Sequence, residues 1–227
     1  MSSIVGRLRD IVGSGAGSRL PQDGAPSTPA NEGGPDENLA DRGANEASRN
    51  KDAVAETLGG WWADSHGQRY LVVDRSYSPG YRHGSMPMMD CLPPWPRLSL
   101  LRGAGECGDP LDHPLFIDLE TTGLTGGAGT YAFLVGCAWF DGPRFRIRQF
   151  FLSAYAGERA LLDALTQLAR GISGVVSFNG KSFDLPLIET RYLFHRLQTP
   201  FAGIPHVDML HPARRLWRAD ENEAAGV

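Results

Sequence analysis

Residues 114–124 constrain the fold more than any other part of the chain, because an apolar run ends there in two acidic residues and a Thr-Thr-Gly turn. Alternate side chains of a strand share one face, so Asp118 and Glu120 point the same way. Ile117 and Leu119 point the other way, into a core. Neighbouring carboxylates repel each other and resist burial, so a fold keeps them most readily with a cation between them. All-oxygen ligands favour Mg²⁺ or Mn²⁺ over zinc. The alternative is a turn with a solvated glutamate.

The composition is that of a globular protein without membrane segments. Hydrophobic residues make up 41% of the 227 residues, and no apolar run reaches the ~18 residues that a membrane helix needs. Residues 1–12 carry charges where a signal peptide needs its apolar stretch, so we expect a cytoplasmic location. Cys91, Cys107 and Cys137 form no CxxC pair, which argues against a disulfide framework or a cysteine zinc site. The net charge of −4 provides no general basic field, so any contact with nucleic acid must be local.

Shifts in composition divide the chain into five parts. Gly, Ser, Pro, Ala, Asn and Asp dominate the segment after the N-terminus, which cannot bury enough apolar surface to offset the entropy of ordering. We predict a short amphipathic helix over 1–14, a disordered linker over 15–57, an irregular wrapping segment over 58–113, the main domain over 114–218 and a tail over 219–227.

Within the main domain, the pattern predicts a mixed α/β sheet flanked by helices. Asp141-Gly142 is typical of a hairpin turn, so the strands on either side of it are antiparallel. Three strands with tight connections followed by α/β crossovers indicate a mixed sheet with helices packed against it. One predicted strand begins at 114, and four more span 131–140, 145–151, 174–178 and 204–207. The predicted helices span 157–170, 183–197 and 208–217.

A second informative stretch, residues 177–186, lies at a predicted strand-to-helix junction, where open α/β sheets commonly place ligand sites. Asp184 stands at the start of the helix. It can act there as an N-cap, or its carboxylate can join Asp118 and Glu120 around a metal. Asn179 and Lys181 lie on the preceding loop, where an amide and a point charge can hold a phosphate.

These two stretches resemble the first and second motifs of the DEDD 3′–5′ exonuclease superfamily, which has a ribonuclease H-like fold. The strings that carry the resemblance are Asp118-Leu119-Glu120-Thr121-Thr122-Gly123-Leu124 and Asn179-Gly180-Lys181-Ser182-Phe183-Asp184. The continuation to Thr130 and the string from His206 to Trp217 are similar to the YprB-type ribonuclease H-like branch. The resemblance covers about residues 114–217 and implies a ribonuclease H-like exonuclease domain.

The resemblance also implies a reaction and a site. It implies two-metal hydrolysis of a phosphodiester at the 3′ end of DNA or RNA, with Mg²⁺ or Mn²⁺ as cofactor. The implied metal ligands and catalytic residues are Asp118, Glu120 and Asp184. The implied substrate contacts are backbone N–H groups of Thr121 and Thr122, the side chain of Leu124 against a base, and Asn179 and Lys181.

One family feature is not visible: the third motif, which carries a general base and a fourth carboxylate on a late helix. We therefore expect a C-terminally incomplete fold, with Asp208 as a substitute metal ligand. His206 and His211 flank Asp208, so a zinc site is an alternative, although satisfied polar groups beside a cleft are the preferred interpretation. Two functions stay open: an exonuclease-like enzyme, or a non-catalytic nucleic-acid-binding or helicase-accessory module with a helicase or repair partner.

Overall fold

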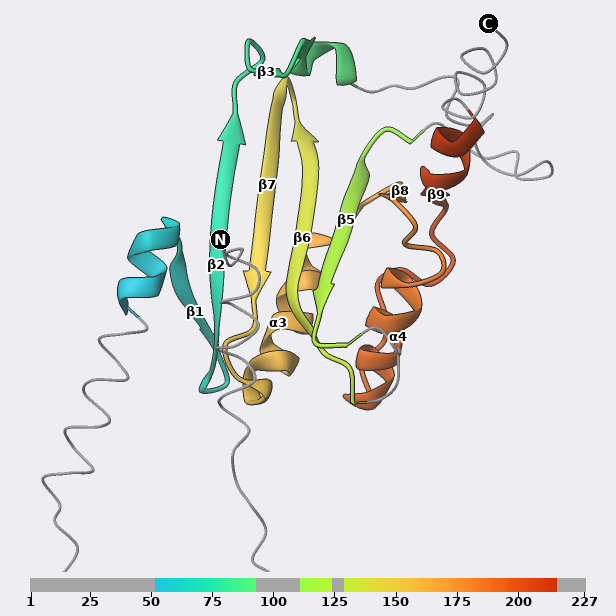
Figure 1. Cartoon of the computed structure of the whole chain (residues 1–227). Coiled ribbons are helices and arrows are strands. Elements are labelled where there is room, and N and C mark those ends of the chain that lie inside the picture. Colours follow the sequence, from blue (N-terminus) through green and yellow to red (C-terminus); the bar gives the residue numbers. More distant parts are fainter. Residues whose placement is uncertain (1–51, 93–110, 124–128, 216–227) are drawn as a thin grey trace, which may run out of the picture.

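The computed structural model describes residues 52–92, 111–123 and 129–215 (Figure 1). The predicted helix over 1–14, the linker as far as residue 51, Leu124 and the tail over 219–227 lie outside the described residues. Among the described residues, no helix has both the length and the apolar character needed to cross a membrane.

A seven-stranded mixed sheet organises the domain, as the sequence predicts. Its order is β1-β2-β7-β6-β5-β8-β9; neighbours from β1 to β5 pair antiparallel, whereas β5, β8 and β9 pair parallel. The strands are β1 (Trp61–Ser65), β2 (Gln68–Tyr77), β5 (Pro114–Thr121), β6 (Ala132–Asp141), β7 (Arg144–Phe151), β8 (Gly174–Ser177) and β9 (His206–Asp208). The helices are formed by residues 52–58, α3 (Glu158–Leu168), α4 (Asp184–Phe194) and residues 210–215. Shorter elements are β3 (Arg82–His83), β4 (Met86–Pro87), η1 (Met88–Cys91) and η3 (Tyr155–Gly157).

The sheet begins earlier in the chain than the predicted main domain. Strand β2, which lies in the predicted wrapping segment, pairs with β7 from Leu71 to Tyr77, and β1 pairs with β2. Residues 52–58, most of them in the predicted linker, form a helix whose Ala55 is buried against Leu71 and Phe151. Local composition did not indicate these contacts because each depends on a partner strand far away in the sequence.

The main core lies between the sheet and the helices. Ile117 and Leu119 are buried in it, as predicted, together with Leu161 and Leu165 of α3 and Ile188 of α4. Figure 1 shows α3 behind β6 and β7. Residues 116, 118 and 120 alternate with this buried set and therefore lie on the other face of β5.

A buried ion pair joins the two helices. Arg191 of α4 is fully buried and donates to both carboxylate oxygens of Glu158 on α3, with Nε–Oε1 at 2.6 Å. The Nε2 of His195 lies 2.7 Å from the same carboxylate. The Arg191 guanidinium also stands 4.1 Å from the ring centre of Tyr131, the residue just before β6. The pair therefore ties α3, α4 and the start of β6 together.

We predict that Arg191→Ala lowers the free energy of unfolding by about 3–5 kcal/mol, because it leaves the Glu158 carboxylate buried without its partner. Urea denaturation followed by circular dichroism measures the change. The matched control is Arg146→Ala in the exposed Arg146–Asp141 pair, which should cost less than about 1 kcal/mol. Equal losses for the two variants would contradict this role of the buried pair.

Candidate functional site

Asp118 and Glu120 lie near the end of β5, on the face away from the main core. Opposite Asp118 on β6 stands Gly136, which has no side chain to cover the carboxylate. Asp118 is exposed on the surface of the sheet, yet partial burial among its neighbours raises its pKa, against a smaller lowering by the Leu119 backbone N–H. The site thus holds one carboxylate in an environment that disfavours its negative charge.

Asp184 is the first residue of α4 and not its cap. The N-cap is Phe183, and no side chain makes a capping hydrogen bond, so the cap alternative is not realised. The pKa of Asp184 is raised to about 6, first by burial and then by the negative charges of Asp118, Asp208 and Glu120. Three residues that are distant in the sequence therefore act on one carboxylate.

The described residues contain no group of three or more His, Cys, Asp or Glu side chains close enough to enclose one metal ion. The assignment of Asp118, Glu120 and Asp184 as metal ligands, and of Asp208 with them, stays a prediction.

The loop between β8 and α4 passes close to the carboxylates of Asp184 and Asp208. Asn179 has a left-handed backbone (φ 66°), a conformation that asparagine adopts more readily than most residues other than glycine. A Cβ atom on Gly180 would lie 2.4 Å from Ser177 Oγ and 3.0 Å from Asp184 Oδ2, so only glycine fits there. The Gly180 carbonyl accepts a hydrogen bond from Leu185 N (3.0 Å), which links the loop to the first turn of α4.

Asp208 holds this loop from the neighbouring strand. Its Oδ1 accepts from Asn179 N (2.7 Å) and Leu210 N (3.0 Å), and its Oδ2 accepts from Lys181 N (3.0 Å). Burial by itself would raise the pKa of Asp208, but these three N–H groups outweigh it and hold the pKa below its usual value. The sequence did not predict this role; the one local signal was the position of Asp208 at the end of a predicted strand.

The two histidines near Asp208 behave differently from each other. His206 Nε2 lies 2.7 Å from Ser177 Oγ, whereas His211 is exposed. Burial lowers the pKa of His206, with a further lowering by Lys181. His206 and Asp208 are therefore satisfied polar groups beside the site, which agrees with the preferred interpretation rather than with a zinc site.

The Thr-Thr-Gly turn is held by its own contacts. Thr122 N donates to Tyr131 O (3.0 Å), and Thr122 Oγ1 accepts from Tyr131 N (3.1 Å). Thr121 Oγ1 donates to Gly123 O (2.8 Å). The Thr122 N–H, which the resemblance assigns to a nucleotide, is thus bonded within the protein.

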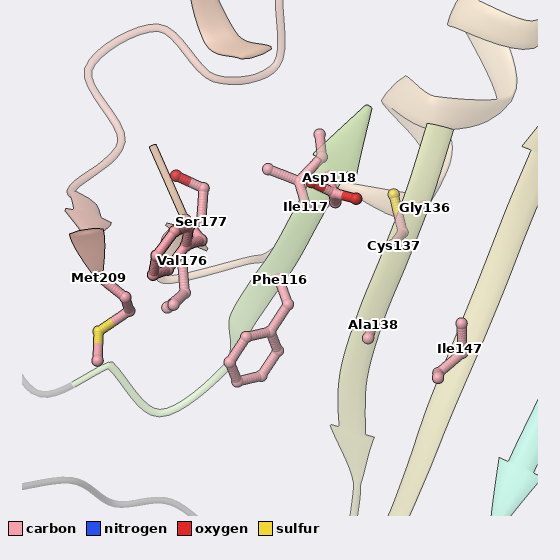
Figure 2. A pocket seen from close by; sticks show the side chains of 11 residues that line it. Phe116, Ile117, Asp118, Gly136, Cys137, Ala138, Ile147, Val176, Ser177 and Met209 are labelled. Atoms are coloured by element: carbon pink, nitrogen blue, oxygen red, sulfur yellow. The ribbon is translucent and has the colours of Figure 1, made fainter. Parts of the chain in front are cut away.

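A shallow pocket of about 400 Å³ on the open face of the sheet is lined in part by Asp118. Figure 2 shows the side chains of Asp118, Phe116, Val176 and Met209 around it. Phe178 also lines the pocket and is 54% exposed. Its aromatic ring was not among the predicted site residues.

We predict that Asp184→Asn stabilises the metal-free protein at pH 7.5. The pKa of Asp184 is raised on folding, so its ionisation weakens the fold as the pH rises from about 4 through about 6. Removing the charge should add about 1 kcal/mol to the free energy of unfolding, since solvent screens a half-buried group.

Urea denaturation in EDTA at pH 4.5 and pH 7.5 measures this difference. Glu189→Gln, on the exposed side of the same helix, is the matched control and should leave the pH dependence unchanged. A loss of stability in Asp184→Asn at pH 7.5 would show that the carboxylate is not under repulsion.

Comparison with known proteins agrees with this architecture. Residues 115–224 match the family model of the RNase_H superfamily. The uncharacterized protein YprB of Bacillus subtilis (strain 168) is 33% identical over 152 residues, which make up 65% of this chain and 37% of YprB. The chain therefore spans well under half the length of that relative. Taken with the mixed sheet and its flanking helices, these matches confirm the predicted ribonuclease H-like fold.

Proposed function

We propose that this domain hydrolyses phosphodiester bonds in nucleic acid, as a divalent-metal-dependent, 3′–5′ exonuclease-like enzyme. The observation that carries the proposal is the convergence of carboxylates from three elements, with Asp118 and Glu120 on β5, Asp184 at the start of α4 and Asp208 on β9. The charges of the other three act on Asp184 and, with burial, raise its pKa to about 6. Such repulsion weakens a fold that holds no cation, and perturbed carboxylates of this kind cluster at active sites.

The donor chemistry of these carboxylates suits a hard divalent cation, and in the described residues their side chains would have to draw closer together to enclose one. Asp118, Glu120 and Asp184 offer only oxygen atoms, which Mg²⁺ and Mn²⁺ prefer, and their mutual repulsion disappears when a cation shares them. When bound, such ions lower the pKa of a water molecule and stabilise the leaving oxygen of a phosphodiester. The three carboxylates would hold the ions, while the adjoining loop holds the substrate.

The loop residues suit a phosphate contact. The backbone N–H of Lys181 is bonded to Asp208, while its side chain is exposed, so the ammonium group is free to meet solvent or a ligand. Its charge reaches the start of β9, where it helps to lower the pKa of His206. A single lysine beside an acidic site is a local contact for phosphate, as the net charge of −4 requires. The preference for a 3′ end rests on the resemblance of the two motifs.

A second candidate function is nucleic-acid binding without cleavage, as in a helicase-accessory module. The observation that favours it is the state of Asp208, whose two oxygens already accept three backbone hydrogen bonds. A fourth carboxylate for a second metal ion is then missing among the described residues near Asp184. A helicase or repair partner remains part of this second candidate.

We predict Mn²⁺-dependent shortening of single-stranded DNA or RNA oligonucleotides from the 3′ end. Parallel assays with 3′-labelled and 5′-labelled substrates, in Mn²⁺, Mg²⁺ and EDTA, separate exonuclease polarity from endonuclease cleavage. Asp118→Ala should lower the rate by at least about 100-fold because it removes an expected metal ligand. Glu189→Gln should retain the wild-type rate.

Three results bear on the choice between the two functions. An undiminished rate in Asp118→Ala would contradict the site assignment. Binding that weakens with salt, with no turnover in any divalent metal, would favour the second candidate. Neither binding nor turnover would reject both.

A further inference from the structure

We infer that Asp208 is a positioning residue that holds the loop between β8 and α4, and thereby Asp184, rather than a ligand of the metal. This inference rests on the proposed function for its catalytic consequence. Its structural part, the hold on the loop, stands on the contacts alone.

The contacts of Asp208 all lead to backbone. Oδ1 receives the N–H groups of Asn179 and Leu210, and Oδ2 receives the N–H group of Lys181. A carboxylate that accepts several backbone N–H groups has its charge satisfied within the protein, which weakens it as a ligand for a cation. Asp208 is also buried, at 7% exposure, while Asp118 is open to solvent.

The strand that carries Asp208 is well fixed. Strand β9 pairs in parallel with β8, where Ser177 stands beside Asp208. Met209 N donates to Ser177 O (2.8 Å), and His206 Nε2 contacts Ser177 Oγ. These hydrogen bonds are made by the residues on either side of Asp208, so they fix the backbone that carries its carboxylate next to the end of β8.

The loop is tightly placed between Ser177 and Asp184. Asn179 adopts a left-handed conformation, which asparagine tolerates better than most residues other than glycine. At the next residue, Gly180, the side chains of Ser177 and Asp184 leave no room for a Cβ atom. The Gly180 carbonyl accepts a hydrogen bond from Leu185 N in the first turn of α4. Two bonds from Asp208 bracket Gly180, on Asn179 and on Lys181. A shift of the loop would therefore displace the start of α4 and the Asp184 carboxylate.

Substitution by asparagine separates the two possible roles. An asparagine oxygen in the place of Oδ1 can still accept from Asn179 and Leu210, whereas its NH₂ group cannot accept from Lys181. A loop support therefore survives in large part in Asp208→Asn and is lost in Asp208→Ala. A metal ligand would lose most of its effect in both variants, because either change removes the charge.

The test uses the full chain with Asp208→Asn, Asp208→Ala, Asp184→Asn as the ligand comparator and Glu189→Gln as the matched control. Amide hydrogen exchange, read residue by residue by NMR, reports the loop independently of activity. The amides of Asn179, Lys181 and Leu210 should exchange about 10- to 100-fold faster in Asp208→Ala, with unchanged protection in β6. In Asp208→Asn, only the Lys181 amide should exchange clearly faster.

Activity in Mn²⁺ supplies the second readout. We expect kcat to fall by about 10- to 100-fold in Asp208→Ala and by less than 10-fold in Asp208→Asn, against the larger loss in Asp184→Asn. Asp208→Asn with a loss as large as that of Asp184→Asn, and with unchanged exchange of the three amides, would overturn the inference in favour of a metal ligand. If the wild-type protein proves inactive, the proposed function fails while the exchange data still decide whether Asp208 holds the loop.

Discussion

The domain depends on one buried interaction, the pair of Arg191 and Glu158 between its two main helices. Both side chains are removed from water, so each is tolerable only because the other is present. The same guanidinium stacks on Tyr131, whose backbone exchanges two hydrogen bonds with Thr122 in the turn after β5. The pair thus connects α4, which begins with Asp184, to the turn that follows Asp118 and Glu120.

The two faces of the sheet therefore differ in their chemistry. The helical face of the sheet is filled by an apolar core, while the opposite face carries the acidic residues on β5. Asp184 and Asp208 show how environment separates chemically identical groups. Three N–H groups lower the pKa of Asp208, whereas burial and neighbouring charges raise that of Asp184. The carboxylate of Asp208 is therefore satisfied by the backbone, whereas the negative charge of Asp184 is disfavoured where it stands.

Much of the fold followed from local patterns. The alternation along β5, the Asp141-Gly142 turn and the apolar stripes of α3 and α4 predicted the mixed sheet and the buried face. Partners distant in the sequence were not predictable: β1 and β2 join the sheet only because β7 offers them an edge. Likewise, the residues around Arg191 do not predict that its charge is buried, because its burial depends on the packing of α4 against distant segments such as α3.

The sequence by itself determined the chemistry of the candidate site: three carboxylates at strand and helix ends, on a chain of alternating β and α elements. Covalent spacing decides which side chains share a face of one strand, and that much is local. Only the tertiary structure decided which groups meet. The parallel pairing of β8 with β9 brings Asp208 next to the loop, where its carboxylate oxygens accept hydrogen bonds from backbone N–H groups. Asp208 lies 27 to 29 residues from the loop residues that it binds. These hydrogen bonds form only when the sheet has assembled, because no local rule specifies which strand lies next to another.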